Sequence, residues 1–159
     1  MSNLKQTFTS SLLEVGTVQR EVLGTLRQDE RGRWYKYVQF QNSATVAAAA
    51  GDQLVYFAAT GYLNNRVCSR AADGDATLPF PAGVPLAAVA GVAATIYFIW
   101  MQIKGQVVLS TAISGAAAAG KRFTGSTVNA TFATCAAATD PTAGVMYNAT
   151  VGAALDCSF

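Results

Sequence analysis

Residues 96–104 read IYFIWMQIK, and they close a stretch, 76–103, that contains no charged side chain. The apolar run within it, residues 86–101, is 16 residues long. A membrane-spanning helix needs roughly 20 residues, so this run is too short to be one. Its second half is β-branched and aromatic, which favours a strand. We therefore predict a buried strand over residues 95–103 and no membrane partner.

The predicted strand is apolar on both faces. Because side chains alternate along a strand, two sets face opposite ways. One set is Ile96, Phe98, Trp100 and Gln102, and the other is Tyr97, Ile99, Met101 and Ile103. One face fills the core of a β domain, and the other needs a second layer to keep it from water. A partner subunit is the expected source of that layer, and Trp100 is the expected core or interface anchor.

Turn signals divide the rest of the chain into short β-rich segments. Lys104-Gly105 leads into QVVLSTAIS (106–114), which predicts a hairpin. DERG (29–32) separates two further β-rich runs, which predicts another. More strands are expected near residues 52–60, 121–134, 144–150 and 154–159. The pattern predicts an all-β fold, a small antiparallel sandwich or barrel with a jelly roll among the allowed topologies, forming one domain over 16–159.

Residues 1–15 are predicted to form an N-terminal arm. Leu4, Phe8, Leu12 and Val15 have the spacing of one helical face. The serines and threonines between them are weak helix formers, so an extended arm fits equally well. The arm packs either on its own core or on another subunit. We expect Leu4, Phe8 and Leu12 to dock on a neighbouring subunit or shell.

Charge is concentrated near the N-terminus. Residues 1–36 hold ten of the twenty charged side chains, and the net charge is +2. So small a net charge gives no general attraction to nucleic acid or anionic lipid. A body with so few charges tends to associate with copies or partners. Basic and aromatic residues occur together at 27–37, as they do in proteins that bind single-stranded nucleic acid. Asp29 and Glu30 offset the positive charge of this cluster, so we expect no nucleic-acid partner.

The sequence offers little catalytic chemistry. It has no histidine, which excludes Ser-His and Cys-His catalysis. GAAAAGK (115–121) matches the start of a phosphate-binding loop, but Arg122 replaces the magnesium-binding hydroxyl. Asp73-Gly74-Asp75 supplies too few oxygens for calcium. We expect no enzyme activity, no cofactor and no metal. Three widely spaced cysteines are expected to be free thiols, namely Cys68, Cys135 and Cys157.

Three segments resemble head decoration (cement) proteins of tailed bacteriophages. Residues 24–57, GTLRQDERGRWYKYVQFQNSATVAAAAGDQLVYF, share that family's opening: a strand, a D-x-R-G turn, a Y-x-Y-V strand, an Ala-rich connection and a Gly-Asp pair. IYFIWMQIKGQVVL (96–109) is similar to its central aromatic strand. ATDPTAGVMYNATVGAALDCSF (138–159) looks like its closing segment.

The resemblance implies a small β protein that binds the outside of an assembled capsid, at junctions between major capsid subunits. It would stabilise the shell against the pressure of internal DNA. Its partners would be the major capsid protein and itself, as a trimer first and a dimer second. It would be made in the host bacterial cytoplasm and reside on the virion exterior. The interface candidates are Leu4, Phe8, Leu12, Trp34, Tyr35, Tyr97, Ile99 and Trp100.

A ligand- or carbohydrate-binding β-sandwich module is the alternative. Sugars stack on exposed aromatic rings, and the chain offers four aromatic residues in strands for this purpose. They are Trp34, Tyr35, Tyr97 and Trp100. An open, sugar-sized cleft beside these rings would favour the module, and an oligomer without such a cleft would favour the capsid protein.

Overall fold

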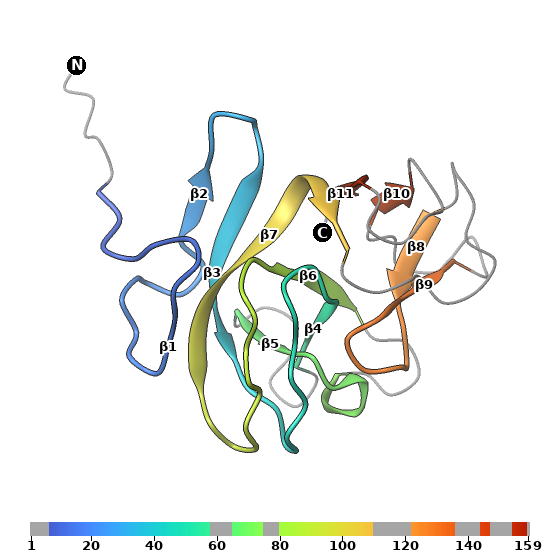
Figure 1. Cartoon of the computed structure of the whole chain (residues 1–159), viewed down its shortest axis with the longest axis horizontal. Helices are drawn as coiled ribbons and strands as arrows, with labels where there is room; N and C mark the ends of the chain where they lie inside the picture. Colours follow the sequence, from blue (N-terminus) through green and yellow to red (C-terminus); the bar gives the residue numbers. More distant parts are fainter. Residues whose placement is uncertain are drawn as a thin grey trace.

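The computed structural model describes residues 7–57, 65–74, 80–109, 122–135, 144–146 and 154–158. Within them the regular structure is almost entirely strands, which confirms the predicted all-β fold (Figure 1). A 3₁₀ turn, η2 (Ala71–Asp73), is the only helical element of the described residues. The strands are β1 (Val15–Gly16), β2 (Leu26–Gln28), β3 (Trp34–Phe40), β4 (Leu54–Tyr56), β5 (Arg66–Cys68), β6 (Pro81–Pro85), β7 (Tyr97–Val108), β8 (Arg122–Gly125), β9 (Phe132–Thr134), β10 (Gly144–Met146) and β11 (Ala154–Ser158).

Five of these strands close into a barrel. They pair in the order β3, β5, β4, β6 and β7, and β7 then pairs back to β3. The β3–β5 pair is parallel, and the other four pairs are antiparallel. The closing ladder runs from Trp34 opposite Lys104 to Phe40 opposite Tyr97. Because β3 and β7 pair with each other, neither has a free edge along this ladder. The fold is therefore a barrel, one of the two architectures that the sequence predicted.

Strand β7 does not turn at Lys104-Gly105, so the predicted hairpin there is wrong. The strand continues for 12 residues to Val108, and its second half pairs with β11. Gly105 has φ of +94°, a conformation that glycine adopts freely, and the strand bends here without reversing. The buried Gln102 holds the bend, because its Nε2 donates to the carbonyls of Lys104 (3.3 Å) and Gln106 (2.9 Å). β7 therefore joins the barrel to the C-terminal strands of one continuous sheet.

The second half of β7 begins a C-terminal sheet beside the barrel. β11, β10, β8 and β9 follow it in that order (Figure 1, orange to red). Buried Phe123 and Phe132 meet edge to face, with ring centroids 5.1 Å apart. The buried Gln53 joins this sheet to the barrel, because its Oε1 accepts a hydrogen bond from the backbone N of Ser126 (3.0 Å).

The interior of the barrel is apolar and closely filled. The alternation predicted for β7 holds, because Ile99 and Met101 point inward and are at most 1% exposed. Ile99 is an interface candidate from the sequence, but it lies in the core of a single chain. An aspartate there would bury an unpaired charge and unfold the barrel before it affected any subunit contact. The buried residues of this core are Val38, Phe40, Ala48, Leu54, Val67, Ala82, Val89, Ile99 and Met101.

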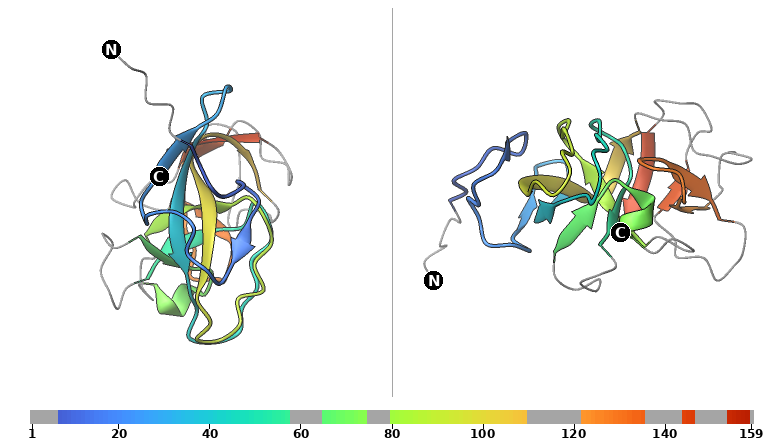
Figure 2. Two further views of the ribbon diagram at one scale, coloured as in Figure 1. Left: turned by 90° about the vertical axis from the view of Figure 1, so that its left-hand side faces the viewer. Right: turned by 90° about the horizontal axis from the view of Figure 1, so that it is seen from below.

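The outer face of the β3–β7 ladder carries a cluster of Tyr35, Tyr37 and Trp100, each at most 2% exposed. Residues 7–25, which we name the N-terminal segment, cover this cluster at the opposite end of the molecule from the C-terminal sheet (Figure 2). The segment is not helical: β1 pairs with β7, and turns and bends make up most of the rest. Its covering role continues past residue 15, the predicted end of the arm.

Phe8 and Leu12 pack on this aromatic cluster of their own chain. The rings of Phe8 and Trp100 meet edge to face at 5.7 Å. The indole Nε1 of Trp100 donates to Ser10 Oγ at 2.9 Å, which satisfies both buried groups. The predicted second layer is therefore real, but the chain supplies it from its own N-terminal segment. Leu4 lies outside the described residues.

Two of the three cysteines can be placed. Cys68 and Cys135 form no disulfide, as predicted. Burial raises the pKa of the Cys68 thiol, which makes it unreactive. The side chain of Cys157 lies outside the described part of the chain. No helix within the described residues is long and apolar enough to cross a membrane.

Replacing Trp100 by alanine should cost ~3–5 kcal/mol of stability, because it removes a fully buried ring together with the indole donor to the Ser10 hydroxyl. Urea unfolding followed by circular dichroism measures this cost. Val128, which is 57% exposed, provides the control, and Val128→Ala should have little effect. Equal costs for the two variants would contradict the burial of Trp100 under the N-terminal segment.

Candidate binding surfaces

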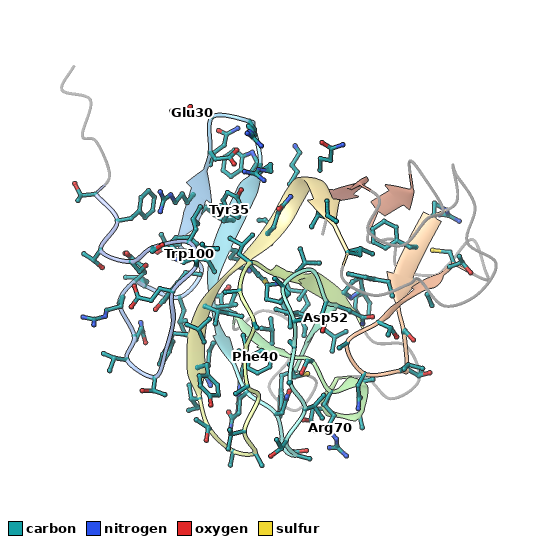
Figure 3. The ribbon with its side chains drawn as sticks, in the orientation of Figure 1. Glu30, Tyr35, Phe40, Asp52, Arg70 and Trp100 are labelled. Atoms are coloured by element: carbon teal, nitrogen blue, oxygen red, sulfur yellow. The ribbon has the colours of Figure 1, made fainter. Side chains whose placement is uncertain are left out.

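The aromatic candidates do not form a common site. Tyr35, Ile99 and Trp100 are each 1% exposed, so a single chain already buries them (Figure 3). Trp34 and Tyr97 are partly exposed but lie at opposite ends of the β3–β7 ladder. That separation is roughly 20 Å at the usual rise along a strand. A continuous stacking platform is therefore absent among these five residues.

Two long loops lie side by side at one end of the barrel. We name residues 41–51 and 86–96 the loop pair, and they run together in both views (Figures 1 and 2). Backbone hydrogen bonds of 2.8–3.0 Å join the two loops like a short ladder. This bonding makes the pair a defined surface and not two independent loops. The bonded residues are Val46 with Gly91, Ala48 with Val89, and Asn42 with Ala94.

Buried polar residues fix the base of the loop pair. The amide of Asn42 bonds Ser69 twice, to its hydroxyl at 3.0 Å and its backbone N at 3.1 Å. The carboxylate of Asp73 accepts from the backbone N of Ser43 (2.6 Å) and from Arg70 (2.8 Å). Asp73 therefore has protein partners for its oxygens and serves to anchor a loop.

The outer surface of the loop pair is apolar and uncharged. Neither segment contains Asp, Glu, Lys or Arg. Val92 is 44% exposed and Ile96 is 39% exposed, and the exposed Ala93 and Ala94 lie between them in the sequence. Contiguous exposed apolar surface of this kind commonly marks an interaction site. The loop pair is one such surface, and the N-terminal segment, where Leu13, Val18 and Val22 are 66%, 62% and 76% exposed, is another.

Asp29 organises the opposite end, the tip of the predicted β2–β3 hairpin. Its carboxylate accepts from the backbone N of Arg31 and of Arg33 (both 3.0 Å) and from the hydroxyl of Tyr35 (2.8 Å). Arg33 adds its Nε at 2.7 Å and an ion pair at 2.6 Å. Desolvation alone would raise the pKa of Asp29, but these bonds outweigh it and lower the pKa to about 2.

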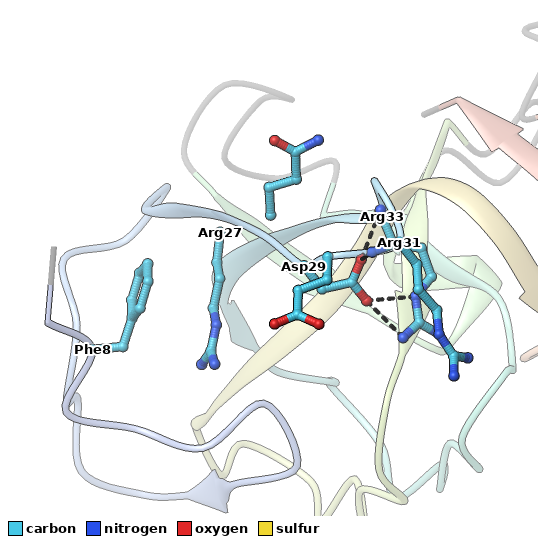
Figure 4. A pocket seen from close by; sticks show the side chains of 7 residues that line it. Phe8, Arg27, Asp29, Arg31 and Arg33 are labelled. Atoms are coloured by element: carbon cyan, nitrogen blue, oxygen red, sulfur yellow. Dashed lines mark hydrogen bonds and ion pairs between the residues drawn. The ribbon is translucent and has the colours of Figure 1, made fainter. Parts of the chain in front are cut away.

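A groove of about 730 Å³ lies on one side of this tip. Figure 4 shows Phe8 and Arg27 beside each other at one end, with the guanidinium 4.8 Å from the ring centroid, and the contacts of Asp29 at the other. Asp29 and Glu30 line the groove together with its arginines. This mixed lining lacks the continuous positive track that a phosphate backbone requires.

Metal and nucleotide chemistry gain no support from the described residues. No group of three or more Cys, Asp or Glu side chains is placed to hold a metal ion in that part of the chain. The loop sequence GAAAAGK (115–121) and Asp75 lie outside it. The predictions of no cofactor and no catalysis therefore stay predictions.

Several residues that hold these surfaces have no local signal in the sequence. The carboxylate of Glu21 accepts from the backbone N of Thr9 (2.7 Å) and of Ser10 (3.0 Å), across more than ten residues. Burial opposes the charged form of Glu21, yet these bonds lower its pKa. The Asn42–Ser69 pair spans 27 residues. From the sequence alone, Thr9 and Ser10 are weak helix formers. Their hydrogen bonds to Glu21 become apparent only in the folded structure.

No protein family, curated protein or solved structure matches the chain. The resemblance to head decoration proteins therefore rests on three segments of the sequence, residues 24–57, 96–109 and 138–159.

The low pKa of Asp29 makes hairpin stability depend on pH. The folded pKa, about 2, is below the ordinary 3.8, so stability is fully present above pH 3.8 and is lost as pH falls towards 2. NMR titration of the carboxyl carbon of Asp29 should give a midpoint near 2. Arg33→Ala should raise it, and Arg27→Ala, on the same hairpin, should not. A midpoint of 3.8 in the unmodified protein would refute these contacts.

Gly91 should tolerate no side chain. Its φ is +62°, and an added Cβ would lie 1.9 Å from the carbonyl oxygen of Val46. Gly91→Ala should therefore cost more than the ~1–2 kcal/mol of a left-handed alanine alone, because the two loops must separate. Gly32 is the matched control, since it has φ of +77° and no atom within 4 Å of the added carbon. Thermal unfolding compares the two, and equal costs would argue against the pairing of the loops.

Proposed function

We propose that the chain is a viral structural protein that decorates the outer surface of a tailed-phage capsid. The loop pair is the observation that carries the proposal, because it is a rigid, uncharged and apolar surface at one end of a closed barrel. The sequence resemblance to head decoration proteins supplies the kind of partner, a major capsid protein. The role is adhesion that stabilises the shell.

The construction of the loop pair suits adhesion. Its internal hydrogen bonds hold the surface in one conformation, so little entropy is lost when it binds. Burying Val92 and Ile96 removes apolar surface from water without desolvating any charge. Each contact of this size is weak, but a symmetric shell presents many copies of its junctions, and the total stabilisation grows with their number.

A cluster of charged side chains lies at the other end. The hairpin tip carries Asp29, Glu30, Arg31 and Arg33, and it projects away from the loop pair (Figures 1 and 3). This arrangement favours one orientation, in which the loop pair faces the shell and the tip faces solvent. The proposed location is the exterior of the virion, after synthesis in the bacterial cytoplasm.

Self-association is part of the proposal, as a trimer first and a dimer second. The N-terminal segment exposes apolar side chains, since Leu13, Val18 and Val22 are 66%, 62% and 76% exposed. Sedimentation equilibrium of the purified protein gives the number of copies directly.

The alternative, a ligand- or carbohydrate-binding module, loses its basis. Two of its four stacking residues, Tyr35 and Trp100, are buried beneath the N-terminal segment. The other two, Trp34 and Tyr97, lie at opposite ends of the same ladder. The arrangement therefore favours a protein-binding surface over a sugar platform.

The double variant Val92→Glu/Ile96→Glu should lose binding to capsids, because it places two charges in an uncharged contact. The measurement is co-sedimentation with shells of the same phage assembled without this protein. Val128→Glu is the control, since Val128 is also exposed (57%) but lies in the β8–β9 connection. The proposal fails if the double variant binds as well as the control, provided that both show the same circular dichroism spectrum.

A further inference from the structure

A second groove, of about 360 Å³, lies between the hairpin tip and the second half of β7. Arg31 lines one side of it, and Gln106 and Val108 line another. Pro85 and Leu86, where β6 ends, complete an apolar wall with Val108, which is 57% exposed. The groove thus combines a cation with an apolar wall.

On the side of β3, the edge of β7 has no strand partner beyond Lys104 in the described part of the chain. Pairing with β3 ends at Trp34 opposite Lys104. Lys104 is also opposite Ser158, so β11 must occupy the other edge of β7. Gly105 still approaches Arg33 closely, and beyond it the hairpin turns away. Residues 105–108 therefore leave an open edge, which is able to accept one more strand.

The charge of this groove is positive and uncompensated. Arg33 is neutralised by Asp29, but the guanidinium of Arg31 has no hydrogen-bond or ion-pair partner among the described residues. The described residues that line the groove include no acidic side chain. The first groove differs in this respect, because Asp29 and Glu30 both line it. An anionic group is thus favoured in the second groove only.

We propose that this second groove binds an extended, acidic segment of another polypeptide. The segment adds a strand to the open edge of β7 at residues 105–108. It places a carboxylate against Arg31 and an apolar side chain against Pro85, Leu86 and Val108. The groove reaches the ends of the loop pair at Ala50, Gly51 and Leu86 but does not include Val92 or Ile96, and the proposal does not depend on the proposed capsid function.

The test uses the full chain and a fluorescent five-residue peptide of alternating threonine and valine with glutamate at both ends. The same peptide with lysine at both ends is the comparison. Fluorescence anisotropy should show binding of the glutamate peptide and at least tenfold weaker binding of the lysine peptide. Arg31→Ala should weaken binding of the glutamate peptide about tenfold, the scale of one charge-assisted hydrogen bond.

Arg27→Ala is the matched control, because Arg27 lies on the same hairpin but lines only the first groove. It should bind the glutamate peptide as the unmodified protein does. In NMR spectra the bound peptide should shift the backbone amides of residues 105–108. The proposal is overturned if the glutamate peptide does not bind, if both arginine variants behave alike, if the shifted amides lie elsewhere, or if a single-stranded oligonucleotide binds and the peptide does not.

Discussion

The pairing of β3 with β7 is the constraint on which the rest of the structure depends. The ladder closes the barrel, and its register decides which side chains face inward. Val38 lies opposite Ile99 on the inner face, and Tyr37 lies opposite Trp100 on the outer face. Since both faces are apolar, neither tolerates water over a large area. The outer face therefore needs a cover, and the N-terminal segment provides it. Without this segment the Trp100 indole and the rings around it would be exposed.

The same ladder explains why the two ends of the barrel differ. Because β3 and β7 are antiparallel, the end of β3 at Phe40 meets the start of β7 at Tyr97. The loop that leaves β3 and the loop that enters β7 must therefore begin as neighbours, and their sequences, rich in alanine and free of charge, let them stay together. At the other end the start of β3 meets the bend of β7, where the charged hairpin tip projects.

Much of this architecture follows from local sequence, and the errors have identifiable causes. The β2–β3 hairpin, the alternation along β7 and the all-β class depend on patterns within ten residues or so, which propensity and periodicity capture. The bend at Gly105 was not predictable, because a glycine with positive φ serves a turn and a strand bend equally well. Pairing with β11, about fifty residues later in the chain, is what favours a bent strand over a turn at Gly105. The cover over Trp100 likewise needs Ser10, 90 residues away. The buried state of Ile99 follows from barrel closure, and that of Tyr35 follows from the cover on the outer face, neither of which a single segment encodes.

At the hairpin tip, one arginine is paired within the described part of the chain and another is left free to bind an external group. Asp29 takes bonds from two backbone N–H groups, one hydroxyl and one guanidinium, which use its oxygens fully. The side chain of Arg33 is paired with Asp29 in this network. The backbone N of Arg31 also donates to Asp29, whereas the side chain of Arg31 has no partner among the described residues. A cation on a rigid turn loses less entropy on binding than one on a flexible loop. The geometry that stabilises the turn therefore also prepares Arg31 for an external anion, at the place where β7 leaves its edge open.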